Sequence, residues 1–350
     1  MDQHEGFSKM EFDMNLNKLQ KSVFQISVIF LSALICMSLS GCGEEKKKVY
    51  HVGILSEVDA FTAIADGFKY KMAELGYMEG KNIVYDVQVA NMEPGQGKQA
   101  AQKFIQDKVD LIFAFPTEAS ITAKKAAQGT DIPVVFANAN IEGTNLVDNV
   151  RDPGKNITGV RFPGADNDVK RLEFLHQFVP EAKRVLIVYN PNYPTTQKVV
   201  KALRQSAPSF GISLLEDHVT SVEELKDALQ KRSDMDDIGI DALLIMPEFL
   251  NHTPDGFAAI INFTNKHKLP LAGGAPFTVE LGAVFTFHPD FYETGILAAT
   301  LINKIFKGTP AGTIPVTTPE SHLIINYKVM KKLGLPVNDG LFSMATKIIR

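Results

Sequence analysis

The feature that most constrains the fold is an alternation of apolar strand-like runs with segments of helical periodicity, and this alternation occurs twice. In the first half the strand-like runs are 49–55, 83–87, 109–114 and 133–137. The helical segments between them are 60–75, 97–106 and 118–128. A strand–helix repeat of this kind predicts a parallel sheet with helices on both faces.

The second half repeats the pattern. Its strand-like runs are 184–189, 212–215, 242–246 and 269–272, and its helical segments are 171–178, 195–210, 221–231 and 256–267. Each half has a helix that ends in an aromatic or aliphatic residue followed by glycine, at 75–76 and at 210–211. We therefore predict an α/β fold of two doubly wound parallel-sheet lobes related by an old duplication, with linking segments near 156–160 and 283–287.

The N-terminal segment reads as a targeting signal. Residues 23–39 are almost continuously apolar, a length suited to a signal h-region, and Leu39-Ser40-Gly41-Cys42 resembles the bacterial lipobox. This pattern predicts a signal peptide over 1–41, lipidation of Cys42 and a polar tether over 42–48. An uncleaved N-terminal anchor is the alternative, and the start codon could encode Met1, Met10 or Met14.

Composition and motifs argue against nucleic-acid binding and catalysis. Lys and Arg total 36 against 40 for Asp and Glu, which gives a net charge of −4 and no basic footprint for nucleic acid. The two cysteines fall in the leader and at its cleavage site, so they leave no disulfide framework or thiolate site. The glycine-rich nucleotide loops, the Gly-x-Ser-x-Gly elbow and the His-x-x-x-His spacing are all missing. We expect a protein that is not an enzyme and uses no cofactor and no metal.

Polar and aromatic residues gather where the expected strands end. Ligands of doubly wound sheets bind at the carboxyl ends of the strands, and these residues suit a small polar ligand with an apolar body, although ordinary turn chemistry would use similar residues. The candidate ligand-binding residues are Ser56, Glu57, Phe61, Thr117, Glu118, Asn138, Asn140, Asn190, Tyr193, Glu248, Phe249, Gly274 and Phe277. Asp290, beside an expected linking segment, is a further candidate, with helix capping as its alternative role.

Several segments carry a family resemblance. They include 53–55, 67–68, 74–83, 110–112, 132–136, 156–160, 188–191, 269–274, 292–295, 307–308 and 331–335. Over about residues 49 to 336 the chain resembles the ABC-transporter substrate-binding proteins that include tryptophan- and tyrosine-binding lipoproteins. The resemblance implies a type I periplasmic-binding-protein fold with three hinge crossovers. Its N-terminal lobe would comprise 49–158 plus 287–312, and its C-terminal lobe 159–286 plus 313–350.

The same resemblance implies a function. The expected protein is a monomeric receptor that delivers a small solute to the permease and ATPase of an ABC importer. It would be anchored through the lipid on Cys42 and face the periplasm or cell exterior. A ligand sensor that hands its closed form to a membrane signalling partner is the alternative. The family usually has Pro, a small hydroxyl residue, Asp and Asn where this chain has Pro247-Glu248-Phe249-Leu250, and 115–118 also departs from it. An aromatic amino acid is one possible ligand, and Glu248 would then pair with its ammonium group.

Overall fold

The structure is a computed structural model that describes residues 48–91 and 93–350. Residues 49–350 form one compact unit. The expected signal peptide, Cys42 and most of the tether lie outside the described residues. Within the described part of the chain, no helix has the length and apolar character needed to cross a membrane.

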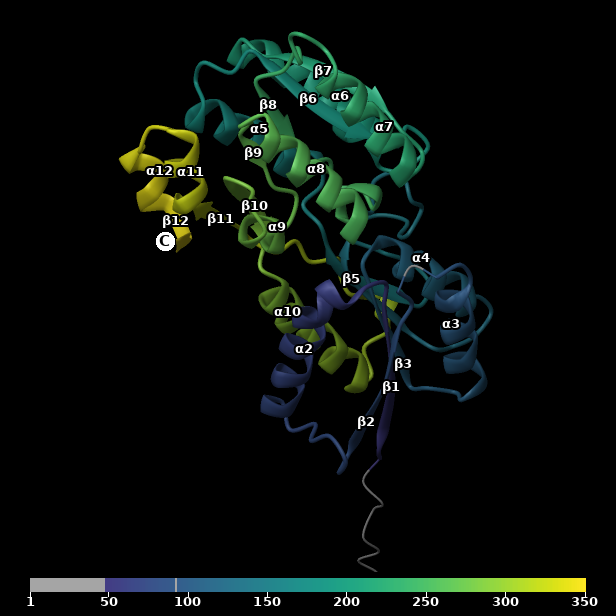
Figure 1. Cartoon of the computed structure of the whole chain (residues 1–350). Helices are drawn as coiled ribbons and strands as arrows, with labels where there is room; N and C mark the ends of the chain where they lie inside the picture. Colours follow the sequence, from purple (N-terminus) through teal and green to yellow (C-terminus); the bar gives the residue numbers. More distant parts are fainter. Residues whose placement is uncertain (1–47, 92) are drawn as a thin grey trace, which may run out of the picture. The chain divides into compact units, whose positions relative to one another are not determined.

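The first lobe is built on a five-stranded sheet in which every pair of neighbours is parallel (Figure 1). Its strand order is β2-β1-β3-β4-β5. The strands are β1 (Tyr50–Ser56), β2 (Ile83–Val89), β3 (Leu111–Phe115), β4 (Val134–Ala139) and β5 (Ile157–Arg161). Helices α2 (Thr62–Glu74) and α10 (Phe291–Phe306) pack on one face, and α3 (Gln96–Gln106) and α4 (Thr117–Ala126) on the other. The buried strands are apolar on both faces because helices cover both.

Helices α2 and α10 come from distant parts of the sequence, and two glycines bring them together. A Cβ on Gly67 would collide with the backbone carbonyl of Tyr292, and a Cβ on Gly295 would collide with that of Ile64. Only glycine permits this close backbone approach. Helix α10 therefore packs against α2 on the first sheet, far from its neighbours in the sequence.

The second lobe is built on a seven-stranded sheet of order β12-β11-β10-β9-β8-β6-β7. Among the described strands of this sheet, only the pair β10–β11 is antiparallel. The strands are β6 (Arg184–Tyr189), β7 (Ser213–His218), β8 (Ala242–Leu244), β9 (Leu271–Ala272), β10 (Phe285–Pro289), β11 (Ser321–Asn326) and β12 (Ala345–Ile349). The two parallel-dominated sheets confirm the expected α/β architecture.

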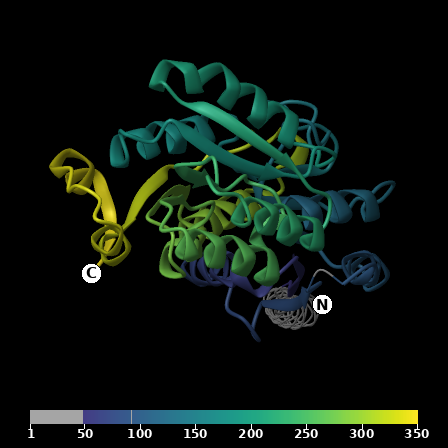
Figure 2. The same cartoon turned by 45° about the horizontal axis from the view of Figure 1, so that its top comes forward.

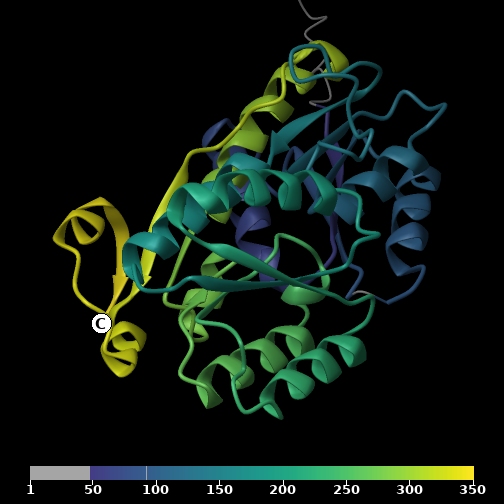
Figure 3. The ribbon, with the colours of Figure 1, turned by 90° about the horizontal axis from the view of Figure 1, so that it is seen from above.

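Helices cover both faces of the second sheet (Figure 2). One layer holds α5 (Ala165–Phe178) and α6 (Thr196–Ser206), and the other holds α7 (Val222–Ser233) and α8 (Pro254–Lys266). Short helices α9 (Pro276–Glu280), α11 (Tyr327–Leu333) and α12 (Asp339–Met344) complete the lobe, with α11 and α12 near the β12 edge (Figure 3). The 3-10 turns are η1 (Asp59–Phe61), η2 (Ala207–Phe210), η3 (Leu250–His252) and η4 (Ala311–Thr313).

The expected linking segments need correction. Residues 156–160 largely form β5 of the first sheet, and residues 283–287 enter β10 of the second. The chain therefore passes between the lobes three times. The first passage follows Arg161, the second lies between Pro289 and Phe291, and the third follows Thr317, which forms a β-bridge with Val160. Short apolar runs are compatible with a linker or a strand, and pairing with a distant neighbour decides between them.

Candidate functional site

A cavity lies between the lobes, at the carboxyl ends of strands from both sheets. Its volume of about 80 Å³ is several times the roughly 10–15 Å³ that one water molecule requires on the same measure. The expected residues that line it are Glu57, Phe61, Thr117, Glu118, Asn138, Asn140, Tyr193, Glu248, Phe249, Gly274 and Phe277. The strand ends of both lobes thus converge on one place, as parallel strands require.

Three expected residues do not line the cavity. The Ser56 hydroxyl donates to the carbonyl of Val58 (2.9 Å) and shapes the loop after β1. The Asn190 side chain accepts a bond from the backbone N–H of Asn192 (2.9 Å), which is turn chemistry. Asp290 is exposed, and its carboxylate accepts a bond from the backbone N–H of Glu293 (2.9 Å). It is the N-cap of α10, which is the alternative role expected for it.

This capping role makes a prediction for Asp290. We expect Asp290→Ala to lower the free energy of unfolding by about 1 kcal/mol, since α10 loses its N-terminal acceptor, and to leave ligand affinity unchanged. Asp290→Asn is the matched control, because asparagine caps helices equally well, and it should match the wild type. Chemical denaturation and calorimetric titration give the two quantities. A loss of affinity in either variant without a loss of stability would restore the ligand role.

Glu248 is the least exposed acid of the cavity, with 4% of its surface exposed. Its Oε1 atom has no hydrogen-bond partner within the described part of the chain. Burial raises the pKa of Glu248 to about 7, and the backbone N–H groups of Asn190, Leu250 and Asn251 oppose that shift. The following turn is held in place because Asn251 donates to the carbonyl of Val188 (2.8 Å). Glu248 therefore presents an unpaired oxygen that a ligand could satisfy.

Glu118 and Tyr193 connect the two lobes across the cavity. Glu118 lies in the first turn of α4, and the Tyr193 hydroxyl, from the loop after β6, donates to its Oε1 atom at 2.5 Å. Burial raises the pKa of Glu118, and the bond from Tyr193 opposes the rise. At the end of β1, the neighbour of β3 in the same sheet, burial and then the charge of Glu118 raise the pKa of Glu57 to about 7. Three carboxylates thus interact within one enclosure.

Two histidines that the sequence reasoning missed also line the cavity. The Nδ1 atom of His252 lies 2.8 Å from the carbonyl oxygen of Glu248, and that of His288 lies 2.7 Å from the carbonyl oxygen of Pro289. Since a carbonyl can only accept, we assign the proton to Nδ1 in both rings. Burial lowers the pKa of His252 to about 4 and that of His288 to about 3, so both rings are neutral near pH 7.

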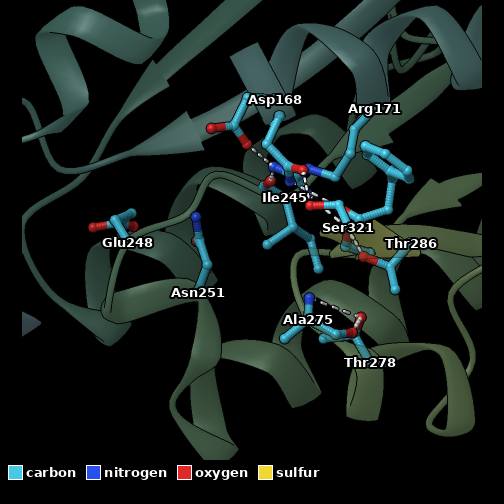
Figure 4. Close-up of polar contacts among 12 residues, drawn as sticks. Asp168, Arg171, Ile245, Glu248, Asn251, Ala275, Thr278, Thr286 and Ser321 are labelled. Atoms are coloured by element: carbon cyan, nitrogen blue, oxygen red, sulfur yellow. Dashed lines mark hydrogen bonds and ion pairs between the residues drawn. The ribbon is translucent and has the colours of Figure 1, made fainter. Parts of the chain in front are cut away.

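A buried ion pair bonds to the segments that lead into the cavity (Figure 4). Arg171 and Asp168 on α5 are 1% and 0% exposed and bond to each other. The Arg171 guanidinium also donates to the carbonyls of Ile245 and Gly273, both at 2.7 Å. It therefore fixes the ends of β8 and β9, from which Glu248 and Gly274 enter the cavity. In sequence this pair looks like an ordinary surface pair on a helix.

Aromatic rings supply much of the remaining wall. Phe162 and Phe291, from two of the interlobe passages, join the expected Phe61, Phe249 and Phe277. The ring of Phe61 meets that of Phe291 edge-on, with centroids 5.2 Å apart. Across the described residues, no group of His, Cys, Asp or Glu side chains is arranged to hold a metal ion. The arrangement can bind and enclose a small molecule with polar and apolar parts.

Comparisons with known proteins agree with this geometry. Residues 51–349 match the family described as ABC transporter substrate binding protein. The tyrosine-binding protein of Clostridioides difficile (strain R20291) is 27% identical over 334 residues, which cover 90% of this chain and 93% of that protein.

Solved structures share the fold. The ABC domain from Streptococcus pneumonia in complex with L-Trp has a TM-score of 0.77 and 20% identity, with coverage of 86% of this chain and 100% of that one. A ligand-free, open substrate binding protein with adhesive properties from Clostridium difficile has a TM-score of 0.66 and 25% identity, with coverage of 86% and 99%. The chain belongs to the family of ABC transporter substrate-binding proteins, which bind solutes and are not enzymes.

Proposed function

We propose that this protein captures a small organic molecule in the cavity between its lobes and delivers it to the permease and ATPase of an ABC importer. The observation that carries the proposal is the cavity itself. Strand ends of both lobes line it, and the Tyr193–Glu118 bond joins the two lobes there. Binding a ligand from both sides favours the closed arrangement, since a ligand shifts a conformational equilibrium by its differential affinity for the two states. The three interlobe passages serve as the hinge between an N-terminal and a C-terminal lobe.

The ligand retained through native purification tests this proposal. Mass spectrometry of the undenatured protein should reveal a bound small molecule, and its removal should lower the melting temperature. L-tyrosine and L-tryptophan belong in the first titration panel because relatives are named for binding them. A protein that retains nothing, and whose melting temperature no solute in a broad panel changes, would contradict capture in the cavity.

We also propose that the protein is anchored by a lipid on Cys42 and faces the periplasm or cell exterior. The supporting observation is the lipobox-like Leu39-Ser40-Gly41-Cys42 after an apolar run. We expect Cys42→Ser to accumulate as unprocessed precursor without incorporating labelled fatty acid, because the thioether lipid needs the cysteine sulfur. Cys36→Ser, in the same leader, is the matched control and should be labelled normally. Equal labelling of both variants would remove the lipid assignment.

A further inference from the structure

The charge of the cavity wall has one sign. Its acidic side chains are Glu57, Glu118 and Glu248, and none of the described residues lining it is Lys or Arg. The three acids come from three different segments, and the charge of Glu118 acts on both of the others. They therefore converge on a common region, where one positively charged group would interact with all three.

Glu248 supplies an independent sign of a missing partner. The residue is 96% buried, since 4% of its surface is exposed, and its Oε1 atom has no partner within the described residues. A buried carboxylate oxygen without a donor is costly, and the ligand is the group that can supply one. Burial and the neighbouring charge of Glu118 both favour the protonated acid, and an incoming cation would reverse that preference.

The remaining titratable groups offer no positive charge to a ligand anion. The Nδ1 protons of His252 and His288 are committed to backbone carbonyls, which leaves lone pairs on their Nε2 atoms. Arg171 does not line the cavity, and its charge is matched by Asp168. The N-terminus of α4, which could attract an anion, already carries Glu118 in its first turn. A ligand carboxylate would meet carboxylates and lone pairs, with neutral amides such as Asn138 as its donors.

We propose that the ligand is an organic cation with an apolar body and no carboxylate group. The aromatic rings of the wall suit both parts, because they pack against an apolar body and their faces attract cations. This inference rests on the proposed capture of a small molecule in the cavity, and it narrows the ligand to a chemical class. A ligand of this class differs from the amino acids named for similar proteins, because amino acids are zwitterions at neutral pH.

Pairs of probes that differ only by a carboxylate test the inference. Calorimetric titration of the ligand-free protein would compare tyramine with L-tyrosine, tryptamine with L-tryptophan, and agmatine with L-arginine. We expect at least one amine to bind, and to bind at least about tenfold more tightly than its amino acid. An amino acid that binds as tightly as its amine overturns the inference, and so does an absence of amine binding at about 10 mM.

The ligand retained through native purification separates this inference from the proposed function. A retained molecule with net positive charge supports both. A retained zwitterion or anion supports capture in the cavity but overturns the cationic ligand. Absence of any retained molecule, together with no binding of any probe, overturns both.

Discussion

The substitution Glu248→Gln should have opposite effects on binding and on stability. At about pH 8 we expect the affinity for the tightest-binding probe of the titration panel to fall roughly thirtyfold or more, because a buried charge-assisted bond loses its ionic partner, at a cost of about 2–5 kcal/mol. In the ligand-free protein we expect the melting temperature to rise. The amide keeps the size of the side chain and removes only the charge that burial disfavours.

The sign of the stability effect follows from the pKa of Glu248. That pKa is raised from 4.5 to about 7 on folding, so the folded protein binds more protons than the unfolded chain between these values. Stability therefore falls as the pH rises through this window, and the full penalty applies above about pH 7. It amounts to at most a few kcal/mol, since each pKa unit corresponds to about 1.4 kcal/mol. Burial is the largest cause of the rise in the pKa of Glu248; the charge of Glu118 adds to it and backbone N–H groups oppose it. The charge of Glu248 in turn raises the pKa of Tyr193.

The measurements are calorimetric titration and thermal unfolding at about pH 5 and pH 8. The gain in melting temperature of Glu248→Gln should be present at the higher pH and shrink at the lower one. Glu173→Gln is the matched control, because Glu173 pairs with Lys170 on the surface of α5 and lies away from the cavity. Its effects should stay within about 0.5 kcal/mol at both pH values. If Glu248→Gln and the wild type bind the probe with equal affinity, Glu248 has no role in ligand binding.

Most candidate residues of the sequence analysis line one cavity, because two local signals coincide there. Apolar runs mark the parallel strands, and the polar residues that follow them meet at one edge of each sheet. Glu57, Glu118 and Glu248 belong to this class, and all line the cavity. Ser56 and Asn190 also follow strands but bond within their own turns. Position after a strand therefore predicts nearness to the site, and the turn geometry decides which side chains reach it.

The residues that the sequence reasoning missed depend on contacts between distant segments. His288 and Phe291 flank the passage from the second sheet to α10, and that passage is placed by the packing of α10 on α2. The backbones of the two helices approach each other closely at Gly67 and Gly295. The periodicity of neither helix reveals this contact. Asp290 shows the opposite case, since its local capping signal alone predicts the bond that its side chain makes.

Arg171→Met should strongly destabilise the second lobe. Removing one member of a buried ion pair leaves the charge of Asp168 in a site with no exposure to water, at a cost of about 3–5 kcal/mol. Burial itself raises the pKa of Asp168, and only Arg171 opposes this, so the carboxyl of the variant should take up a proton as part of the response. The carbonyls of Ile245 and Gly273 also lose the guanidinium as donor, although Thr286 still donates to Gly273 at 2.9 Å.

We expect the melting temperature of Arg171→Met to fall by about 10 °C, measured by circular dichroism on the ligand-free protein. Arg204→Met is the matched control, since Arg204 pairs with Glu216 at 2.6 Å at an exposed site where an ion pair contributes at most about 1 kcal/mol. The double variant Asp168→Leu/Arg171→Met removes both charges, so it should be more stable than Arg171→Met alone. The contrary result is a fall in melting temperature of the double variant equal to the sum of the falls for Asp168→Leu and Arg171→Met. The pair would then stabilise the second lobe through packing, and the burial of its charges would have no part.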